Sequence, residues 1–391
     1  MAVSTKLEPE YEELRRTVAE FARAEIAPVI GGYYEREEFP YPIVTRMGEL
    51  GLFGLPLPEE VGGQGGDYFA FCLALEELAR VDSSVAVTLE AAVGLGAMPI
   101  WRFGSDAQKR EWLPDLCAGR SLAAFGLTEP GGGSDAGALA TTARLESDEW
   151  VLNGTKAFIT NSGTELSAVA IVMAVTGHRD DGRNEISAFL VPTGLPGFTV
   201  SRKYSKVGWS ASDTRELAFA DCRVPAGNLL GTRGKGYRQA LETLDEGRIA
   251  VSAIAVGLAQ GCIDECLVYV GERETFGRRI GEYQAVQFKL ADMATRTHAA
   301  RLTWYHAASK LLAGEPFKKE AAMAKLAASD AAMINAREAT QIFGGYGYMN
   351  ETPVGRFYRD AKILEIGEGT SEVLRLLVAR ELGLPASTSG V

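Results

Sequence analysis

Residues 149–160 read EWVLNGTKAFIT, a stretch rich in β-branched and aromatic residues that separates two long parts of the chain with helical periodicity. Its Asn153-Gly154 pair favours a two-residue turn, so the stretch predicts a β-hairpin. The same strand-like composition continues downstream in SAVAIVMAV, ISAFLVP and RELAFADCRVP. We therefore expect a β domain in the middle of the chain.

Helices are predicted on both sides of this β domain. Before it, apolar residues recur at three- and four-residue steps in four segments, residues 10–27, 43–52, 69–80 and 106–117. After it come long Ala-rich segments, of which residues 318–342 stop at Gly344-Gly345. The predicted fold is mainly α with a β insert, divided into an N-terminal helical domain (residues 1–124), a middle β domain (125–236) and a C-terminal four-helix bundle (237–391).

Composition excludes several classes of function. The formal charge of -11 argues against a nucleic-acid partner. No apolar run is expected to cross a bilayer, and the polar start is unlike a secretory signal, so we expect a cytoplasmic protein with no membrane span. Five cysteines include no CxxC pair, and no metal site is predicted. The tail PASTSGV is predicted to be disordered.

Two motifs have the residue types of an anion or nucleotide site. FGLTEPGGGSD (125–135) has clustered glycines whose N–H groups can approach a ligand, although it does not open a helix as a Rossmann fingerprint does. ERETFGRRIGEYQAVQ (272–287) crowds arginines into a short loop between helices. From the residues alone, the first motif is either a ligand loop or a structural turn, and the second is either a phosphate site or a solvated charged face.

A third motif, EIGEGTSEV (365–373), places Glu368 between Gly367 and Gly369 just before a predicted helix. Glycine on both sides removes bulk and lets another group approach the carboxylate closely. The alternative is a solvated acid in a glycine-rich turn.

Taken together, the motifs resemble those of the acyl-CoA dehydrogenase family. The resemblance rests on eight segments in the family's order, spread over nearly the whole chain: TEPGGGSD, NGTKAFITN, VGWSASDTRELAFADCRVP, LDEGRIAVSAIAVGLAQ, RETFG, QAVQFKLADM, QIFGGYGY and RDAKILEIGEGTSE. It implies a helical domain, a β-barrel-like domain and a four-helix bundle, and a homotetramer with FAD bound between the β and C-terminal domains.

The resemblance also assigns cofactor residues. Those expected to line the flavin or its phosphates are Phe125, Leu127, Thr128, Gly133, Ser134, Phe158, Ile159 and Thr160. Those expected at the part of the site completed by a neighbouring subunit are Arg273, Thr275, Phe276, Gln341 and Gly345. Further cofactor contacts are expected at Gln284, Thr370 and Glu372.

By the same resemblance, Glu368 is the base that removes the α-proton of an acyl-CoA thioester while a hydride leaves the β-carbon for the flavin. Electrons would then pass to an electron-transferring flavoprotein. Gly367 and Gly369 leave room for the thioester, and Ser134 is expected near the pantetheine chain. Asp245 and Arg248 of LDEGR border the CoA and the base, or else form a structural ion pair between helices.

Two departures from the family bear on specificity. Many members have Tyr where this chain has Gly367, and many have Trp where it has Phe158. Members of the isovaleryl type have Ala at the position of Glu368 and take their base from the position of Gly247. We expect a wide cavity that accepts short or methyl-branched acyl chains, as in fatty acid or branched-chain amino acid catabolism. A flavin oxidase of the same fold, a dehydrogenase of acyl-carrier-protein thioesters and a non-catalytic binding module are the alternatives.

Overall fold

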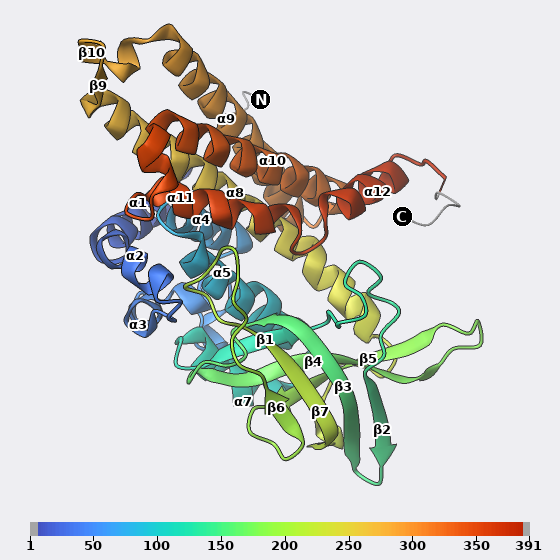
Figure 1. Cartoon of the computed structure of the whole chain (residues 1–391). Helices are drawn as coiled ribbons and strands as arrows, with labels where there is room; N and C mark the ends of the chain where they lie inside the picture. The colour runs from blue at the N-terminus through green and yellow to red at the C-terminus, as the bar shows by residue number, and fades with distance from the viewer. Residues whose placement is uncertain (1–6, 386–391) are drawn as a thin grey trace.

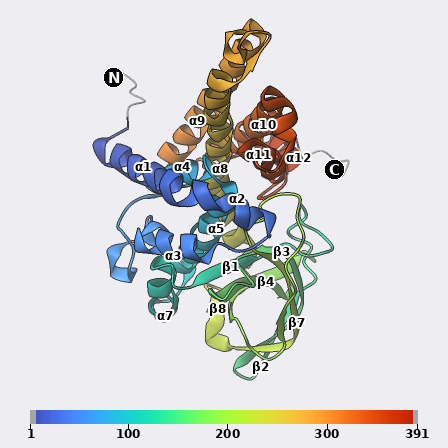
Figure 2. The same ribbon diagram turned by 60° about the vertical axis from the view of Figure 1, so that its left-hand side comes forward.

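The computed structural model describes residues 7–385. Residues 1–6 of the polar start and residues 386–391 of the PASTSGV tail, which was predicted to be disordered, lie outside this range. A helical N-terminal part packs on an eight-stranded sheet and on a long C-terminal helical bundle (Figures 1 and 2). The N-terminal helices are α1 Pro9–Phe21, α2 Ala27–Glu35, α3 Tyr41–Glu49, α4 Tyr68–Ala79, α5 Ser83–Ala92, α6 Met98–Phe103 and α7 Asp106–Cys117. Two π-helical turns, Ala22–Ile26 and Val93–Ala97, join α1 to α2 and α5 to α6.

The sheet is built mostly from antiparallel pairs in the order β6-β7-β3-β2-β4-β5-β8, with β1 parallel to β4. Its strands are β1 Leu122–Gly126, β2 Thr142–Glu146, β3 Glu149–Thr160, β4 Ser167–His178, β5 Asn184–Pro192, β6 Phe198–Val200, β7 Thr214–Pro225 and β8 Leu229–Leu230. The strands predicted in SAVAIVMAV, ISAFLVP and RELAFADCRVP are confirmed as β4, β5 and β7.

The predicted hairpin turn at Asn153-Gly154 is wrong. Residues 149–160 form one uninterrupted strand, β3, and the hairpin turn lies just before it, where Glu146 of β2 pairs with Glu149. Gly154 instead adopts φ +146° where the register between β3 and β7 shifts. The positive φ that makes Asn-Gly suitable for a hairpin turn suits a β-bulge equally well.

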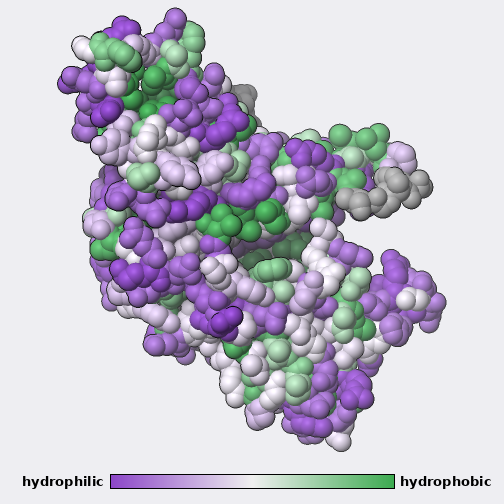
Figure 3. Space-filling model, viewed as in Figure 1, coloured by the Kyte–Doolittle hydropathy of each residue, from purple (hydrophilic) through white to green (hydrophobic). Residues whose placement is uncertain are grey.

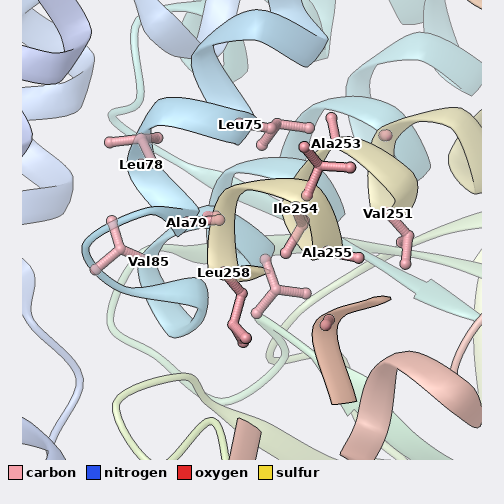
Figure 4. Close-up of a cluster of buried hydrophobic side chains, with 14 of the residues drawn as sticks. Leu75, Leu78, Ala79, Val85, Val251, Ala253, Ile254, Ala255 and Leu258 are labelled. Carbon is pink, nitrogen blue, oxygen red and sulfur yellow. The ribbon is translucent and has the colours of Figure 1, made fainter. Parts of the chain in front are cut away.

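The C-terminal helices are α8 Gly236–Glu272, α9 Gln284–Leu312, α10 Lys318–Phe343, α11 Pro353–Ala361 and α12 Ser371–Glu381, with a small hairpin of β9 Glu274–Thr275 and β10 Arg278–Arg279 between α8 and α9. Figure 4 shows side chains of α4 and α5 meeting those of α8 in one buried cluster. Small residues such as Ala253 and Ala255 let these helices approach closely, and each fully buried Leu or Ile stabilises the fold by about 1.5–3 kcal/mol.

Two helical stretches are long and apolar enough to cross a membrane, Ser83–Phe103 and Gly236–Glu272, contrary to the expectation from the sequence. In the structure 89% and 72% of their most apolar windows are buried. Burial of this extent is typical of the core helices of a globular protein, because such helices are apolar on most sides.

Asp360, at the end of α11, connects three parts of the fold. Its carboxylate accepts hydrogen bonds from Tyr34 of α2 (2.8 Å), from Ser83 of α5 (2.8 Å) and from the backbone N–H of Trp209 in the loop before β7 (2.7 Å). Residue 361 begins the segment that leads to Glu368, so this buried network fixes the position of that segment against both the N-terminal helices and the β domain.

Candidate active site

Glu368 lies in a tight, strained loop between α11 and α12. It has φ +53°, a left-handed backbone that costs energy for a residue with a side chain, and Gly369 after it has φ +105°, which favours glycine. Thr370 ends the loop, because its hydroxyl accepts a hydrogen bond from the N–H of Val373 (3.2 Å) and caps α12. Strain of this kind is retained where it holds a functional group in place.

The Glu368 side chain points inward against α8. Its Oε2 is buried, and a Cβ atom at Gly247 would overlap with it. Leu95 of the π-helical turn lies beside the same position. Burial raises the pKa of Glu368 to about 7, against the lowering effects of Glu90, Lys325 and Arg248. A carboxylate with a pKa near neutrality is suited to act as a general base.

Two cations hold the loop around Glu368 through its backbone. Arg248 Nε lies 3.5 Å from the carbonyl oxygen of Glu368, and Lys325 Nζ donates to the carbonyl oxygen of Gly369 (2.8 Å). Arg248 also pairs with Asp245, one turn away on the same helix rather than between helices. The structure therefore brings Asp245, Arg248 and Glu368 together.

The glycine-rich loop between β1 and β2 folds around Glu129. The Glu129 carboxylate accepts hydrogen bonds from the N–H groups of Ala140 (2.7 Å) and Thr141 (3.0 Å) and pairs with Lys156 Nζ (2.6 Å). Lys156 is fully buried, and burial lowers its pKa to about 8 against the raising effect of Glu129. This ion pair supports a loop whose Gly133 and Ser134 remain exposed.

The two motifs of the β domain are adjacent, because the N–H of Ala157 donates to the carbonyl of Thr128 (2.9 Å). Phe158 presents an aromatic ring that is 65% exposed, beside the ring of Tyr204. Phe125, Thr128 and Thr160 are half-buried. The side chains of Leu127 and Ile159 are buried in the two cores on either side of the sheet, so only their backbone atoms remain to face a cofactor.

The second set of predicted cofactor residues lies at the opposite end of the bundle. The β9–β10 hairpin projects from the far ends of α8 and α9, away from the β sheet (Figure 1). There the Arg273 guanidinium lies 5.8 Å from the ring centroid of Tyr346, and Phe276 is 98% exposed. The remaining members, Thr275, Gln284, Gln341 and Gly345, belong to the same region and are exposed or half-buried. One chain therefore does not bring the two sets together.

The surface between the β domain and the C-terminal helices is hollowed, with apolar surface at its edge (Figure 3). A separate cavity of about 400 Å³ between Tyr33, Lys203 and Arg215 contains none of the predicted site residues, so it is not this site. Within residues 7–385 no cluster of three or more His, Cys, Asp or Glu side chains could hold a metal ion.

Several residues of the site were not predicted from the sequence: Glu90, Leu95, Glu129, Lys156 and Lys325. Glu90 and Lys325 lie in segments whose small and apolar residues indicate packed helices. The available signal was a charge within an otherwise uncharged stretch, Glu90 in SSVAVTLEAA and Lys325 in AAMAKLAAS, because an unpaired charge is costly to bury.

Comparison with known proteins identifies the family. The chain matches the acyl-CoA dehydrogenase N-terminal domain over residues 8–120, the middle domain over 124–222 and the C-terminal domain over 234–383. The chain belongs to the acyl-CoA dehydrogenase family. This membership confirms the predicted fold class, the enzyme class and FAD as cofactor.

Similar proteins extend over nearly the full chain. The short-chain specific acyl-CoA dehydrogenase of Rattus norvegicus mitochondria is 46% identical over 97% of this chain and 91% of its own length. The butyryl-CoA dehydrogenase of Megasphaera elsdenii is 42% identical with a TM-score of 0.93, covering 97% of this chain and 100% of that one. A chain from a structure of the electron transferring flavoprotein of Acidaminococcus fermentans is 44% identical with a TM-score of 0.94, covering 97% and 99%.

Proposed function

We propose that this protein is an acyl-CoA dehydrogenase for short acyl chains, which converts the thioester to the trans-2-enoyl-CoA and passes electrons to an electron-transferring flavoprotein. The observation that carries the proposal is the position of Glu368, a carboxylate held over Gly247 with its Oε2 buried and its pKa raised to about 7 by burial. Neutral solution then leaves a large fraction of this group ionised and able to take a proton.

Glu368 would remove the α-proton of the thioester. Its side chain packs against α8 at Gly247, and Arg248 and Lys325 hydrogen-bond to the backbone carbonyls of Glu368 and Gly369. The carboxylate therefore does not have to be reoriented for the reaction. Within residues 7–385 the N–H of Glu368 forms no hydrogen bond, which leaves this donor available for the thioester oxygen as negative charge develops there.

FAD fits the residues of the β domain. Exposed backbone of the glycine-rich loop lies next to the exposed face of Phe158, a combination suited to phosphates and to a flat heteroaromatic ring. Thr128 and Ser134 add hydroxyl groups. When bound, FAD would accept the hydride that leaves the β-carbon of the substrate.

Assembly as a homotetramer is part of the proposal. The two sets of cofactor residues lie at opposite ends of one chain, so a complete site needs the β9–β10 end of a second copy. The exposed side chains of Phe276, Phe288 and Tyr348 near that end support contact with another chain, because large apolar groups are seldom left in water in such numbers.

The acyl chain is proposed to be short, C4 to C6 or methyl-branched. Relatives named for short-chain substrates and for butyryl-CoA support the length. Gly367 supports the width, since no side chain projects from this position beside the base. The apolar side chains beside these two glycine positions are Leu95 at Gly247 and Ile363 at Gly367.

We also propose domain boundaries near residues 124 and 236, supported by the start of β1 at Leu122 and of α8 at Gly236. A cytoplasmic location is proposed as well, supported by full-length similarity to a bacterial dehydrogenase.

Spectroscopy of the purified protein tests the proposal. We expect a yellow protein with about one FAD per chain, whose flavin absorbance is bleached by butyryl-CoA without oxygen and restored by an electron-transferring flavoprotein. Rapid restoration by air would instead indicate the oxidase, and bleaching only by the acyl-carrier-protein thioester would indicate the carrier-protein enzyme. Protein that binds no FAD would contradict the proposal altogether.

A further inference from the structure

Glu90, on the buried helix α5, is a second carboxyl group at the proposed base. The residue is fully buried, and neither of its carboxyl oxygens has a donor among the described residues. The Glu368 carboxyl group lies close enough to act on that of Glu90, and its Oε2 likewise has no hydrogen-bond partner among the described residues. Glu90 belongs to α5 and Glu368 to the loop before α12, almost 280 residues later in the sequence. Their proximity is therefore produced by the tertiary fold.

Each carboxyl group has space made for it by a glycine. A Cβ atom at Gly94 would lie 2.8 Å from Oε1 of Glu90, and a Cβ at Gly247 would overlap with Oε2 of Glu368. Gly94 belongs to the π-helical turn after α5, a type of helix distortion that often occurs at functional sites. Two separate glycines thus leave space for one pair of acids, which indicates that the pairing is a specific feature of the fold and not a chance contact.

The charges around the pair are unequal. Arg248 of α8 and Lys325 of α10 act on Glu368, whereas among residues 7–385 no cation acts on Glu90. Near Glu90 lie Tyr68 and Cys72 of α4, whose phenol and thiol are themselves buried and neutral. Glu246 of α8 is close by but is paired with Arg102.

Two ionised carboxylates cannot hydrogen-bond to each other, because neither has a proton to donate. Like charges in contact away from water cannot both persist, so one of the two must keep its proton. The nearby cations favour the charge on Glu368, and burial together with the Glu368 charge raises the pKa of Glu90 well above its ordinary value.

We propose that Glu90 is a positioning residue for the reaction, carrying the one proton that the pair shares and donating it as a hydrogen bond to the ionised Glu368 in the substrate-free enzyme. Glu368 is thereby kept as a base and oriented toward the thioester site. The inference rests on the proposed role of Glu368, and it adds the partner that sets the protonation of that base.

Infrared spectroscopy of the flavin-bound, substrate-free enzyme tests the proton directly. At about pH 8.5, above the pKa of about 7 of Glu368, we expect a C=O band of a protonated carboxyl group that is absent from Glu90→Gln. The band should be retained in Glu246→Gln, the matched control on a buried glutamate already paired with arginine. If the band survives in Glu90→Gln, the proposal is wrong even where the enzyme is active. If no thioester is oxidised, the proposed function fails while the band still reports on the pair.

The pH dependence of kcat/KM tests the effect on the base. Glu90→Leu removes the hydrogen bond, so the acid limb that reports the pKa of Glu368 should move up by about one pH unit. Glu90→Gln still donates through its amide and should shift this limb much less. An unchanged acid limb in a Glu90→Leu enzyme of normal flavin content would overturn the proposal, and if that variant does not fold, the infrared comparison of Glu90→Gln still decides.

Discussion

Gly247 and the carboxylate of Glu368 occupy adjoining space, so that even the single methyl group of an alanine at 247 would overlap with Oε2. The two residues lie more than a hundred positions apart, one in the middle of α8 and the other in the loop before α12. The absence of a side chain on α8 is therefore what allows Glu368 to point inward.

Gly247→Ala should displace the Glu368 carboxylate while leaving the backbone helical. Displacing a base from its reacting geometry commonly costs about 10²-fold in rate, so we expect kcat/KM to fall by about that factor. The matched control is Gly271→Ala near the end of the same helix, where a Cβ meets nothing within 4 Å. Equal activity of the two variants, each with full flavin content, would show that Gly247 does not position the base.

Gly367→Tyr should narrow the site. A Cβ at 367 would meet the carbonyl of Ile363 at 3.5 Å, an ordinary contact, so the backbone accepts a side chain there. The ring should then reject branched thioesters more than straight ones, by about 1 to 3 kcal/mol. A kcat/KM panel from C4 to C16 measures this, and equal losses for straight and branched chains, or a wild-type preference for C12 or longer, would contradict the wide-cavity interpretation.

Lys156→Met should loosen the glycine-rich loop, because it leaves the Glu129 carboxylate without its cation. Removing one partner of a buried ion pair costs about 3–5 kcal/mol. We expect a lower Tm and weaker FAD retention during gel filtration, whereas Lys319→Met, which removes a partly exposed lysine, should change neither. Full retention of FAD by Lys156→Met would show that the Lys156–Glu129 ion pair does not support the cofactor site.

The sequence suggested candidate site residues where these are adjacent along the chain. Glu368, Gly367 and Gly369 form one short motif, and the Arg273 loop forms another. Glu90 and Lys325 were not predicted because a charge within an uncharged stretch of a helix indicates a partner only when the facing element is known. The prediction of a turn at Asn153-Gly154 was wrong for a different reason. A local preference for positive φ does not distinguish a turn from a bulge within a longer strand.

Stability should depend on pH through Glu368. Burial raises its pKa from 4.5 to about 7, so the folded state holds a proton that the unfolded state loses, and wild-type stability should fall as pH rises from 4.5 to about 7. Glu368→Gln removes this cost. We expect the variant to have the higher Tm at about pH 8, by an amount worth at most about 3 kcal/mol, and a much smaller difference at about pH 5. A Tm difference that is equal at both pH values would contradict the raised pKa.

The most direct test of Glu368 as the base is the turnover of butyryl-CoA by Glu368→Gln, measured with an electron-transferring flavoprotein. The amide preserves the shape of the side chain but cannot accept the α-proton, so we predict a loss of roughly 10²-fold to 10⁴-fold in kcat with an unchanged flavin spectrum and unchanged substrate binding. Near-normal turnover would place the base elsewhere, with Glu246 the first residue to replace.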